Sequence, residues 1–158
     1  MTLHVIDTTT LSNFANQTPG THTCRAERGR SHNRSCLCEL KAGESLGSIP
    51  ASDWGWLPII LLTSKETGLF RQLRLVLDDG EASCLAVAMT RQAVLVTDDR
   101  QARRIAGAEN ILLSSTIGVL RILVRAGRLT RMEANVILEE MIARGYRSPI
   151  SNLPANED

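Results

Sequence analysis

The chain is poor in aromatic residues and in lysine. Its 158 residues include two Trp, one Tyr and two Phe, so the hydrophobic core must be built from Leu, Ile, Val and Ala. Arg outnumbers Lys sixteen to two. Arginine suits phosphate recognition, but GC-rich coding DNA also raises the arginine content, and both explanations stay open. The formal net charge of +1 excludes a strong overall attraction to nucleic acid or membranes.

A secretory signal and a long apolar run are also absent. The start, MTLHVIDTTTLSNFA, has no basic region followed by an apolar stretch. The most apolar segment, residues 57–62, is far too short to cross a bilayer. With four cysteines and no export signal, we expect a reduced cytoplasmic protein that does not contact a membrane.

Large apolar residues are missing from residues 15–36, which contain no Val, Ile, Leu, Met, Phe, Trp or Tyr. Such a stretch has too little apolar surface to bury a face against a core. A disordered loop, a loop organised by a metal, and text foreign to the fold are the three interpretations.

Elsewhere, apolar strands alternate with helical patterns. We expect strands at 3–7, 57–63, 93–97 and 110–114, and helices at 77–89, 100–107, 116–127 and 129–145. In the last helix, Thr130 and Glu133 predict a capping box, and one apolar face is formed by Ala134, Ile137, Leu138, Met141 and Ile142. This alternation indicates an α/β fold with a parallel sheet. We expect a single domain over residues 1–147, atypical at 17–38, with a flexible tail at 148–158.

Five acidic residues fall near the ends of the predicted strands. Asp7 ends the first strand, Asp98 and Asp99 follow VLVT, Glu81 opens the alanine-rich helix, and Glu39 could approach the same rim. Parallel sheets bind ligands beyond the carboxyl ends of their strands. Carboxylates that converge there repel one another unless a cation neutralises them. A site for a hard divalent cation that hydrolyses phosphodiesters is therefore one interpretation.

Each acid also has a structural explanation. Asp98 and Asp99 can cap the following helix, Glu81 suits a helix's first turn, and Glu39 could be an ordinary surface residue. Asp7 is the hardest to explain in this way, because a charge at the end of a buried strand needs a partner. The residues alone leave both interpretations open.

Three successive segments resemble the motifs of a PIN domain in their order and spacing: VIDTTTLSNFA, GEASCLAVA and VLVTDDRQARRIA. The end of the chain, from STIGVLRILVRAG to IARGYRSP, is similar to a PIN-like family with a helical C-terminal extension. The resemblance covers residues 1–16 and about 36–150. It implies a Rossmann-like fold with a central, mostly parallel sheet flanked by helices. It also implies a metal-dependent ribonuclease, in many members the toxin of a toxin–antitoxin pair.

The resemblance assigns roles to individual residues. Four acids match the catalytic positions: Asp7, Glu39, Glu81 and Asp99. Of these, Asp7, Glu81 and Asp99 are the expected ligands of Mg²⁺ or Mn²⁺, with Asp98 as an accessory acid. Thr9 matches a small hydroxyl residue near the substrate. Three arginines are expected beside the RNA backbone, with solvated surface residues as the alternative: Arg100, Arg103 and Arg104.

The implied partners are an RNA substrate and a small antitoxin. Apolar helical faces at 116–142 would suit a homodimer, although packing within the core explains them equally well.

The sequence departs from the family at residues 17–38, where a helix and a second strand are expected. The excess of Arg, Ser, Cys, Gly and His there is typical of a GC-rich gene read out of frame, and we hypothesise a pair of compensating frameshifts. Two alternatives remain. One is a zinc site with unusual C-x-C spacing, formed by His22, Cys24, His32, Cys36 and Cys38. The other is a basic arm that touches RNA, formed by Arg25, Arg28, Arg30 and Arg34.

Two other functions fit parts of the pattern. A haloacid-dehalogenase-like phosphatase would use Asp7 as nucleophile, Thr63 for phosphate and Lys65 as its lysine. Such enzymes need a second Asp two residues after the nucleophile, where this chain has Thr9. The second alternative is a catalytically degenerate PIN-like module that binds RNA or an antitoxin without cutting.

Overall fold

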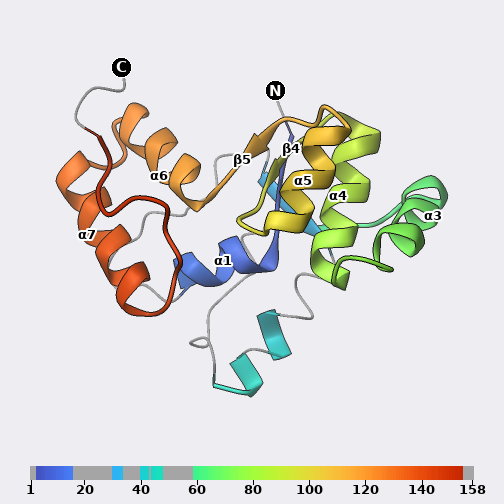
Figure 1. Cartoon of the computed structure of the whole chain (residues 1–158), viewed down its shortest axis with the longest axis horizontal. Helices are drawn as coiled ribbons and strands as arrows, with labels where there is room; N and C mark the ends of the chain where they lie inside the picture. The colour runs from blue at the N-terminus through green and yellow to red at the C-terminus, as the bar shows by residue number, and fades with distance from the viewer. Residues whose placement is uncertain (1–2, 16–29, 34–39, 43, 48–58, 155–158) are drawn as a thin grey trace.

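The computed structural model describes residues 3–15, 30–33, 40–42, 44–47 and 59–154. They form a parallel sheet flanked by helices (Figure 1). The strands are β1 (His4–Ile6), β2 (Arg30–Asn33), β3 (Ile59–Ile60), β4 (Val94–Val96) and β5 (Leu113–Ser114). The helices are α1 (Thr8–Ala15), α3 (Ser64–Leu73), α4 (Asp79–Arg91), α5 (Arg100–Ala108), α6 (Thr116–Arg125) and α7 (Arg131–Ala143). The α/β class predicted from the sequence is confirmed.

The strand order is β3-β2-β1-β4-β5, and each pair of neighbouring strands is parallel. The register pairs Val5 with Leu95 and Ile6 with Val96. Because side chains alternate along a strand, Val5 and Leu95 point to one face of the sheet, and Ile6 and Val96 point to the other.

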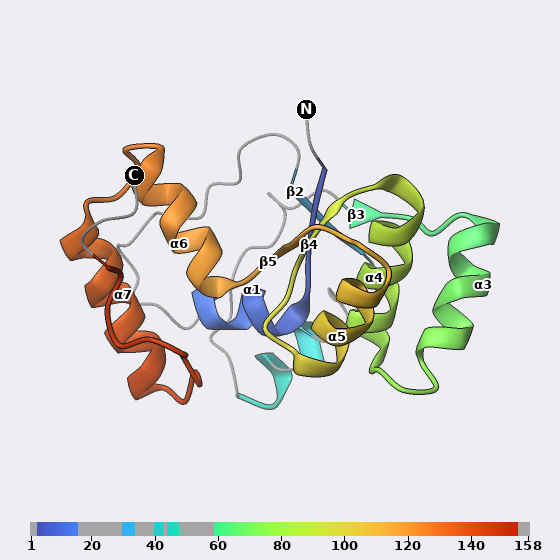
Figure 2. The same cartoon turned by 45° about the horizontal axis from the view of Figure 1, so that its top comes forward.

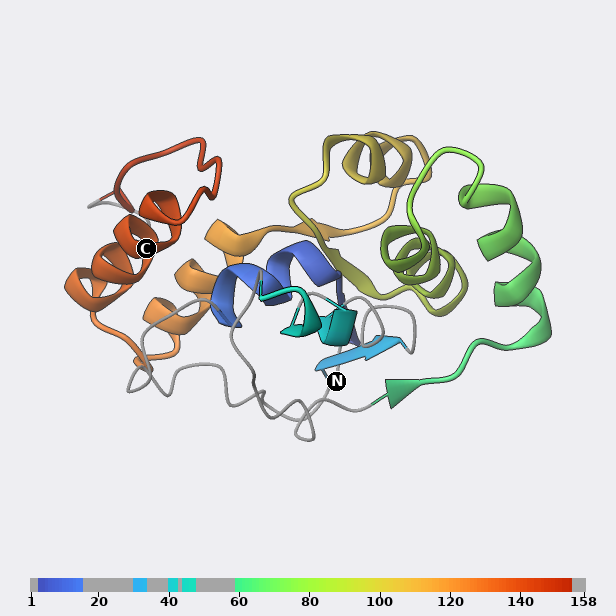
Figure 3. The same cartoon turned by 90° about the horizontal axis from the view of Figure 1, so that it is seen from below.

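Each face carries its own hydrophobic core. Val5 and Leu95 join the core under α4 and α5, whereas Ile6 and Val96 join the core under α1, α6 and α7. In Figure 2, α3, α4 and α5 accordingly lie on one side of the strands, and α6 and α7 lie on the other. Viewed from below, α1 crosses between these two groups of helices (Figure 3). This arrangement leaves the carboxyl ends of β1 and β4 between the two cores.

Helix α4 has buried residues all around, as its alanine-rich sequence predicts, and α7 begins with the predicted capping box of Thr130 and Glu133. The predicted apolar face of α7 is largely confirmed, since Ala134, Ile137, Leu138 and Met141 are buried. Ile142 is 37% exposed and does not belong to it.

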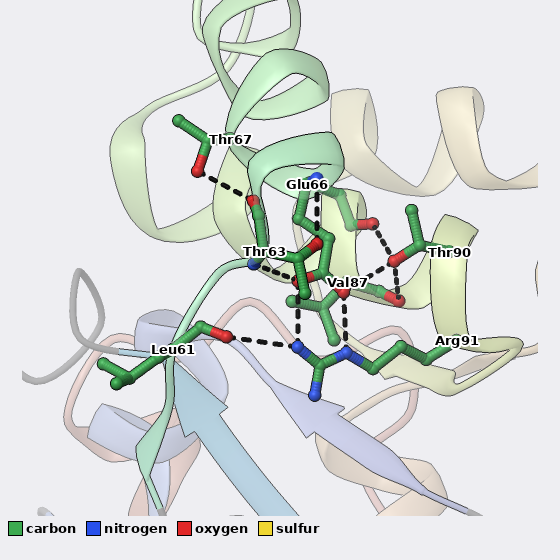
Figure 4. A network of polar contacts seen from close by, with 8 residues as sticks. Leu61, Thr63, Glu66, Thr67, Val87, Thr90 and Arg91 are labelled. Carbon is green, nitrogen blue, oxygen red and sulfur yellow. Dashed lines mark hydrogen bonds and ion pairs between the residues drawn. The ribbon is translucent and has the colours of Figure 1, made fainter.

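Helix α3, which the sequence analysis did not predict, is fixed by a buried acid. The Glu66 side chain is 1% exposed. Its Oε1 accepts bonds from Thr90 Oγ1 at 2.7 Å and Arg91 Nε at 2.6 Å, and its Oε2 accepts one from Arg91 Nη2 at 2.8 Å (Figure 4). A reciprocal capping box with Thr63 completes the set. The network therefore ties the start of α3 to the end of α4.

Two segments differ from expectation. Strand β2 lies inside the stretch 17–38, because strand pairing uses backbone groups that polar residues also carry. Only 30–33 of that stretch are described, so the zinc, basic-arm and frameshift interpretations concern residues or side chains outside the description. The other segment is 148–154, expected to be a loose tail. Leu153 is 7% exposed there, and its backbone N–H donates to Asn135 Oδ1 at 2.8 Å.

Candidate functional site at the carboxyl ends of β1 and β4

Asp7 follows β1 and is fully buried. The Thr10 N–H donates to its Oδ1 at 2.8 Å, which makes Asp7 the cap of the first turn of α1. Its Oδ2 is also buried, and no described residue donates a hydrogen bond to it. Burial raises the pKa of Asp7 to about 6, although the neighbouring Thr97 and Thr10 lower it in part. A buried carboxylate with one unpartnered oxygen is expensive, so this residue points to a ligand.

Glu81 lies in the first turn of α4 and faces other acids. Its pKa is raised to about 8 by partial burial, by a hydrogen bond and charge from Asp78, and by the charges of Asp99 and Asp7. Carboxyl groups from the β1 end, the α4 start and the β4 end therefore lie within electrostatic reach of one another. This proximity favours the predicted convergence of Asp7, Glu81 and Asp99 on one cation, which stays a prediction.

Asp99 caps α5 while remaining part of this acidic group. Its Oδ1 accepts the Ala102 N–H at 2.7 Å. Its own N–H donates to Thr97 Oγ1 at 3.1 Å, and Thr97 is fully buried beside Asp7. The structural and functional interpretations of Asp99 are thus compatible, since capping uses one oxygen and leaves Oδ2 for a cation.

Asp98 is placed differently from its neighbour. Its Oδ1 accepts the Thr116 N–H at 3.1 Å and the Tyr146 hydroxyl at 3.3 Å. Its Oδ2 accepts the Thr116 hydroxyl, and Asn13 Nδ2 at 3.3 Å. Both oxygens are occupied by protein donors, so the geometry does not favour the predicted role of Asp98 as a metal ligand.

The predicted substrate-binding residues fall into two groups, one bonded within the protein and the other exposed. Arg103 Nη1 donates to Thr97 O at 2.9 Å and to Ser114 O at 2.8 Å. Its guanidinium group therefore joins the ends of β4 and β5. Arg100 and Arg104 are exposed on α5, and Thr9 is exposed on α1. These three remain accessible to a substrate.

We compared the sequence with models of known protein families. A family model described as DUF3368, PIN domain, matches residues 33–153. No curated protein and no solved structure matches the chain. The chain belongs to the PIN-domain family. PIN domains are generally nucleases that use divalent metals.

The acids of this PIN domain suit such a metal by their chemistry. Carboxylate oxygens are the ligands that Mg²⁺ and Mn²⁺ prefer, and the unpartnered Oδ2 of Asp7 is a vacant donor. Among the described residues, no group of three or more His, Cys, Asp or Glu already has an arrangement that would hold an ion. Convergence on one ion therefore requires the Asp7, Glu81 or Asp99 side chains to turn further toward one another.

Of the three remaining predicted residues, the structure describes Thr63 and Lys65. Glu39 is outside the described residues. Thr63, the phosphate-binding residue of the phosphatase alternative, caps α3 with its hydroxyl, and Lys65 is exposed on the same helix. The PIN-domain match, which covers both residues, leaves that alternative without support.

Sequence reasoning missed two contributors to the site. Asp78 occupies the N-cap position of α4 without a side-chain capping bond, and it is the largest charged influence on Glu81. The turn LDDG contained the signal, since either Asp78 or Asp79 could face the sheet. Thr97 was not predicted as a site residue, although it contacts both Asp7 and Asp99. No helix in the described part of the chain is long and apolar enough to cross a membrane.

Proposed function

We propose that this PIN domain is a metal-dependent endoribonuclease that hydrolyses RNA phosphodiester bonds. The observation that supports it is the buried Asp7, with one unpartnered oxygen, beside Glu81 and Asp99. Such a group costs folding free energy unless it has a ligand to bind. Family membership supports the nuclease class, and RNA is the finer proposal.

In this mechanism, Asp7, Glu81 and Asp99 would hold Mg²⁺ or Mn²⁺, with Glu39 as a fourth acid. The bound ion supplies polarisation of the phosphate and a more acidic water. The Thr10 and Ala102 N–H groups orient the Asp7 and Asp99 carboxylates. Arg100 and Arg104, exposed on the helix that Asp99 caps, would contact phosphates of the RNA backbone.

The test is cleavage of a mixed single-stranded RNA by the purified full-length chain, with Mn²⁺ and with chelator. We expect cleavage with Mn²⁺ only. Asp7→Asn and Asp99→Asn should lower the rate by more than about 100-fold, the scale of losing one electrostatic element of an active site. Glu139→Gln, an exposed acid on α7, is the matched control and should cleave as wild type. Cleavage that survives both aspartate changes would contradict the proposal.

A toxin role follows from the same resemblance. Induced expression of the wild type should arrest growth of a bacterial host, and Asp7→Asn should not. Co-expression of a small protein encoded beside the chain should restore growth if it is the antitoxin. Normal growth with an active ribonuclease would remove the toxin assignment and leave the nuclease assignment intact.

A non-cutting PIN-like module is the second candidate. Asp98 is engaged by protein donors, and no metal-holding group of three or more acids is preformed in the described residues. A chain that binds RNA equally well with Mn²⁺ and with chelator, and does not cleave it, would favour this candidate.

A further inference from the structure

The Asp98 carboxylate joins three parts of the chain that are distant in sequence. Its donors are Asn13 in α1, Thr116 at the start of α6, and Tyr146 just after α7. Asn13 Nδ2 also donates to Thr116 Oγ1 at 3.1 Å, which closes the network. We call these four residues the Asp98 network.

The Asp98 network is connected to two acids of the proposed site. Asp99 is its covalent neighbour, and Asp7 caps the first turn of the same helix α1 that carries Asn13. Asp98 therefore acts on the β4–α5 loop directly, and on α1 through Asn13 in the second half of that helix. This carboxylate therefore adds a second connection between Asp7 and Asp99, beside their shared neighbour Thr97.

The C-terminal helices reach the site through Tyr146. Gly145 follows the C-cap of α7 with a φ of +103°, and the Tyr146 N–H donates back to Met141 O at 2.9 Å. The ring packs against the core of α6 and α7 while the hydroxyl donates to Asp98. The chain after α7, dark red in Figure 1, thus connects α6 and α7 to the acidic edge, by which we mean Asp7, Glu81 and Asp99.

We propose that Asp98 is a positioning residue, through which Thr116, Asn13 and Tyr146 set the geometry of Asp7 and Asp99 and hence the affinity for a divalent cation. The inference rests on the proposed function. It replaces the role of direct ligand with one that acts through Asp99. Outer contacts of this kind typically change metal affinity by about 10–100-fold when removed.

The test uses two threonines with the same chemistry. Thr116→Val removes a hydroxyl donor from Asp98, and Thr90→Val removes a hydroxyl donor from the buried Glu66, near the far end of α4 from Glu81. The melting temperature should fall by a similar amount in both variants. Calorimetry with Mn²⁺ alone should show about tenfold weaker binding for Thr116→Val and wild-type binding for Thr90→Val.

Tyr146→Phe is the milder second variant and decides the question if Thr116→Val does not fold. It should weaken Mn²⁺ binding several-fold. Wild-type Mn²⁺ affinity in both Asp98-network variants would overturn the inference and leave the proposed function standing. A folded wild type that binds no Mn²⁺ would overturn the two together.

Discussion

Asp7 and Glu81 are carboxyl groups whose surroundings favour the neutral form. For Asp7 the main cause is burial, and for Glu81 it is partial burial followed by the neighbouring Asp78. A protein that retains such groups gives up stability at neutral pH. The cost is understandable if a cation occupies the site in the working state.

Asp7→Asn should therefore stabilise the metal-free chain. At pH 8 the Asp7 carboxylate, with a pKa of about 6, is ionised and buried, whereas an amide stays neutral and still accepts the Thr10 N–H. The expected gain in unfolding free energy is on the order of 2–3 kcal/mol at pH 8, since each pKa unit corresponds to about 1.4 kcal/mol. Urea denaturation at pH 8 and pH 4 measures it. An equal effect at both pH values would contradict the argument.

Tyr146 offers a spectroscopic probe of the Asp98 network, because it is the only tyrosine in the chain. Burial, then the charge and hydrogen bond of Asp98, raise its pKa above the ordinary value of 10.0. Ultraviolet titration should therefore show tyrosinate forming only well above a pH of about 10. Asp98→Asn should bring the transition closer to the ordinary range. The same curve in both proteins would mean that the contact is absent in solution.

At the level of single residues, the sequence indicated which side chains to consider for the site, but not which partners those side chains contact. Asp7, Glu81 and Asp99 were predicted because strand ends and helix starts are visible in the pattern, and their role at the site stays a prediction. Asp98 and Arg103 were assigned functional roles, yet protein donors and acceptors satisfy them. Their partners, such as Thr116 and Ser114, lie far enough along the chain that no local pattern reveals them.

Among the helices and strands, those with a strong periodicity of apolar residues could be predicted from the sequence. The strands β1 and β4 and the helices α4 and α7 were predicted because apolar residues recur with the correct period. Helix α3 was missed, since its sequence SKETGLFRQL has a weak apolar face and depends on Glu66, Thr63 and Arg91. Strand β2 was missed because its residues, RSHN, are all polar.

The ion pair between the buried Glu66 and the more exposed Arg91 should be the main interaction that holds α3 in place. The bidentate contact with Arg91 is the largest of the causes that hold the pKa of Glu66 far below its ordinary value. Arg91→Met removes the charged partner of the buried carboxylate. Because Arg91 is partly exposed, and because Thr63 and Thr90 still donate hydrogen bonds to Glu66, the change should cost about 1–3 kcal/mol. Replacing both partners, with Glu66→Leu and Arg91→Met, should cost less than the single change. Urea denaturation of the three proteins measures this.

The double variant also tests whether Mn²⁺ binding depends on the contact between α3 and the end of α4. Glu66 belongs to α3 and Arg91 ends α4, whereas Glu81 lies in the first turn of α4. Mn²⁺ affinity should therefore stay at the wild-type level in the double variant, provided that it folds. Weaker binding would mean that the acidic edge depends on the anchoring of α3.

For the whole molecule, the alternation of strands and helices predicted the parallel sheet but not its order. The order β3-β2-β1-β4-β5 places β1 at the centre and brings Asp7 next to the β4 end. Nothing in a single sequence specifies which strands are neighbours, since backbone pairing is common to all of them. The division into two cores, with Val5 and Leu95 on one face and Ile6 and Val96 on the other, follows once the order is known.

The global stability of the metal-free chain should fall as the pH rises from about 4 to about 8. Asp7 and Glu81 have ordinary pKa values of 3.8 and 4.5, raised in the folded state to about 6 and about 8. Between the unfolded and folded values the native state binds more protons than the unfolded chain, so each unit of pH lowers the unfolding free energy. Thermal unfolding across this range measures the decline.

Divalent cation should reverse that trend. Mn²⁺ binds the ionised acids of the native state, and so it competes with protons and stabilises by mass action. The rise in melting temperature on adding Mn²⁺ should therefore be larger at pH 8 than at pH 5. Asp7→Asn should show neither the full decline nor the full rise, because the same carboxylate is responsible for both. A rise in melting temperature that is independent of pH would place the cation away from Asp7 and Glu81.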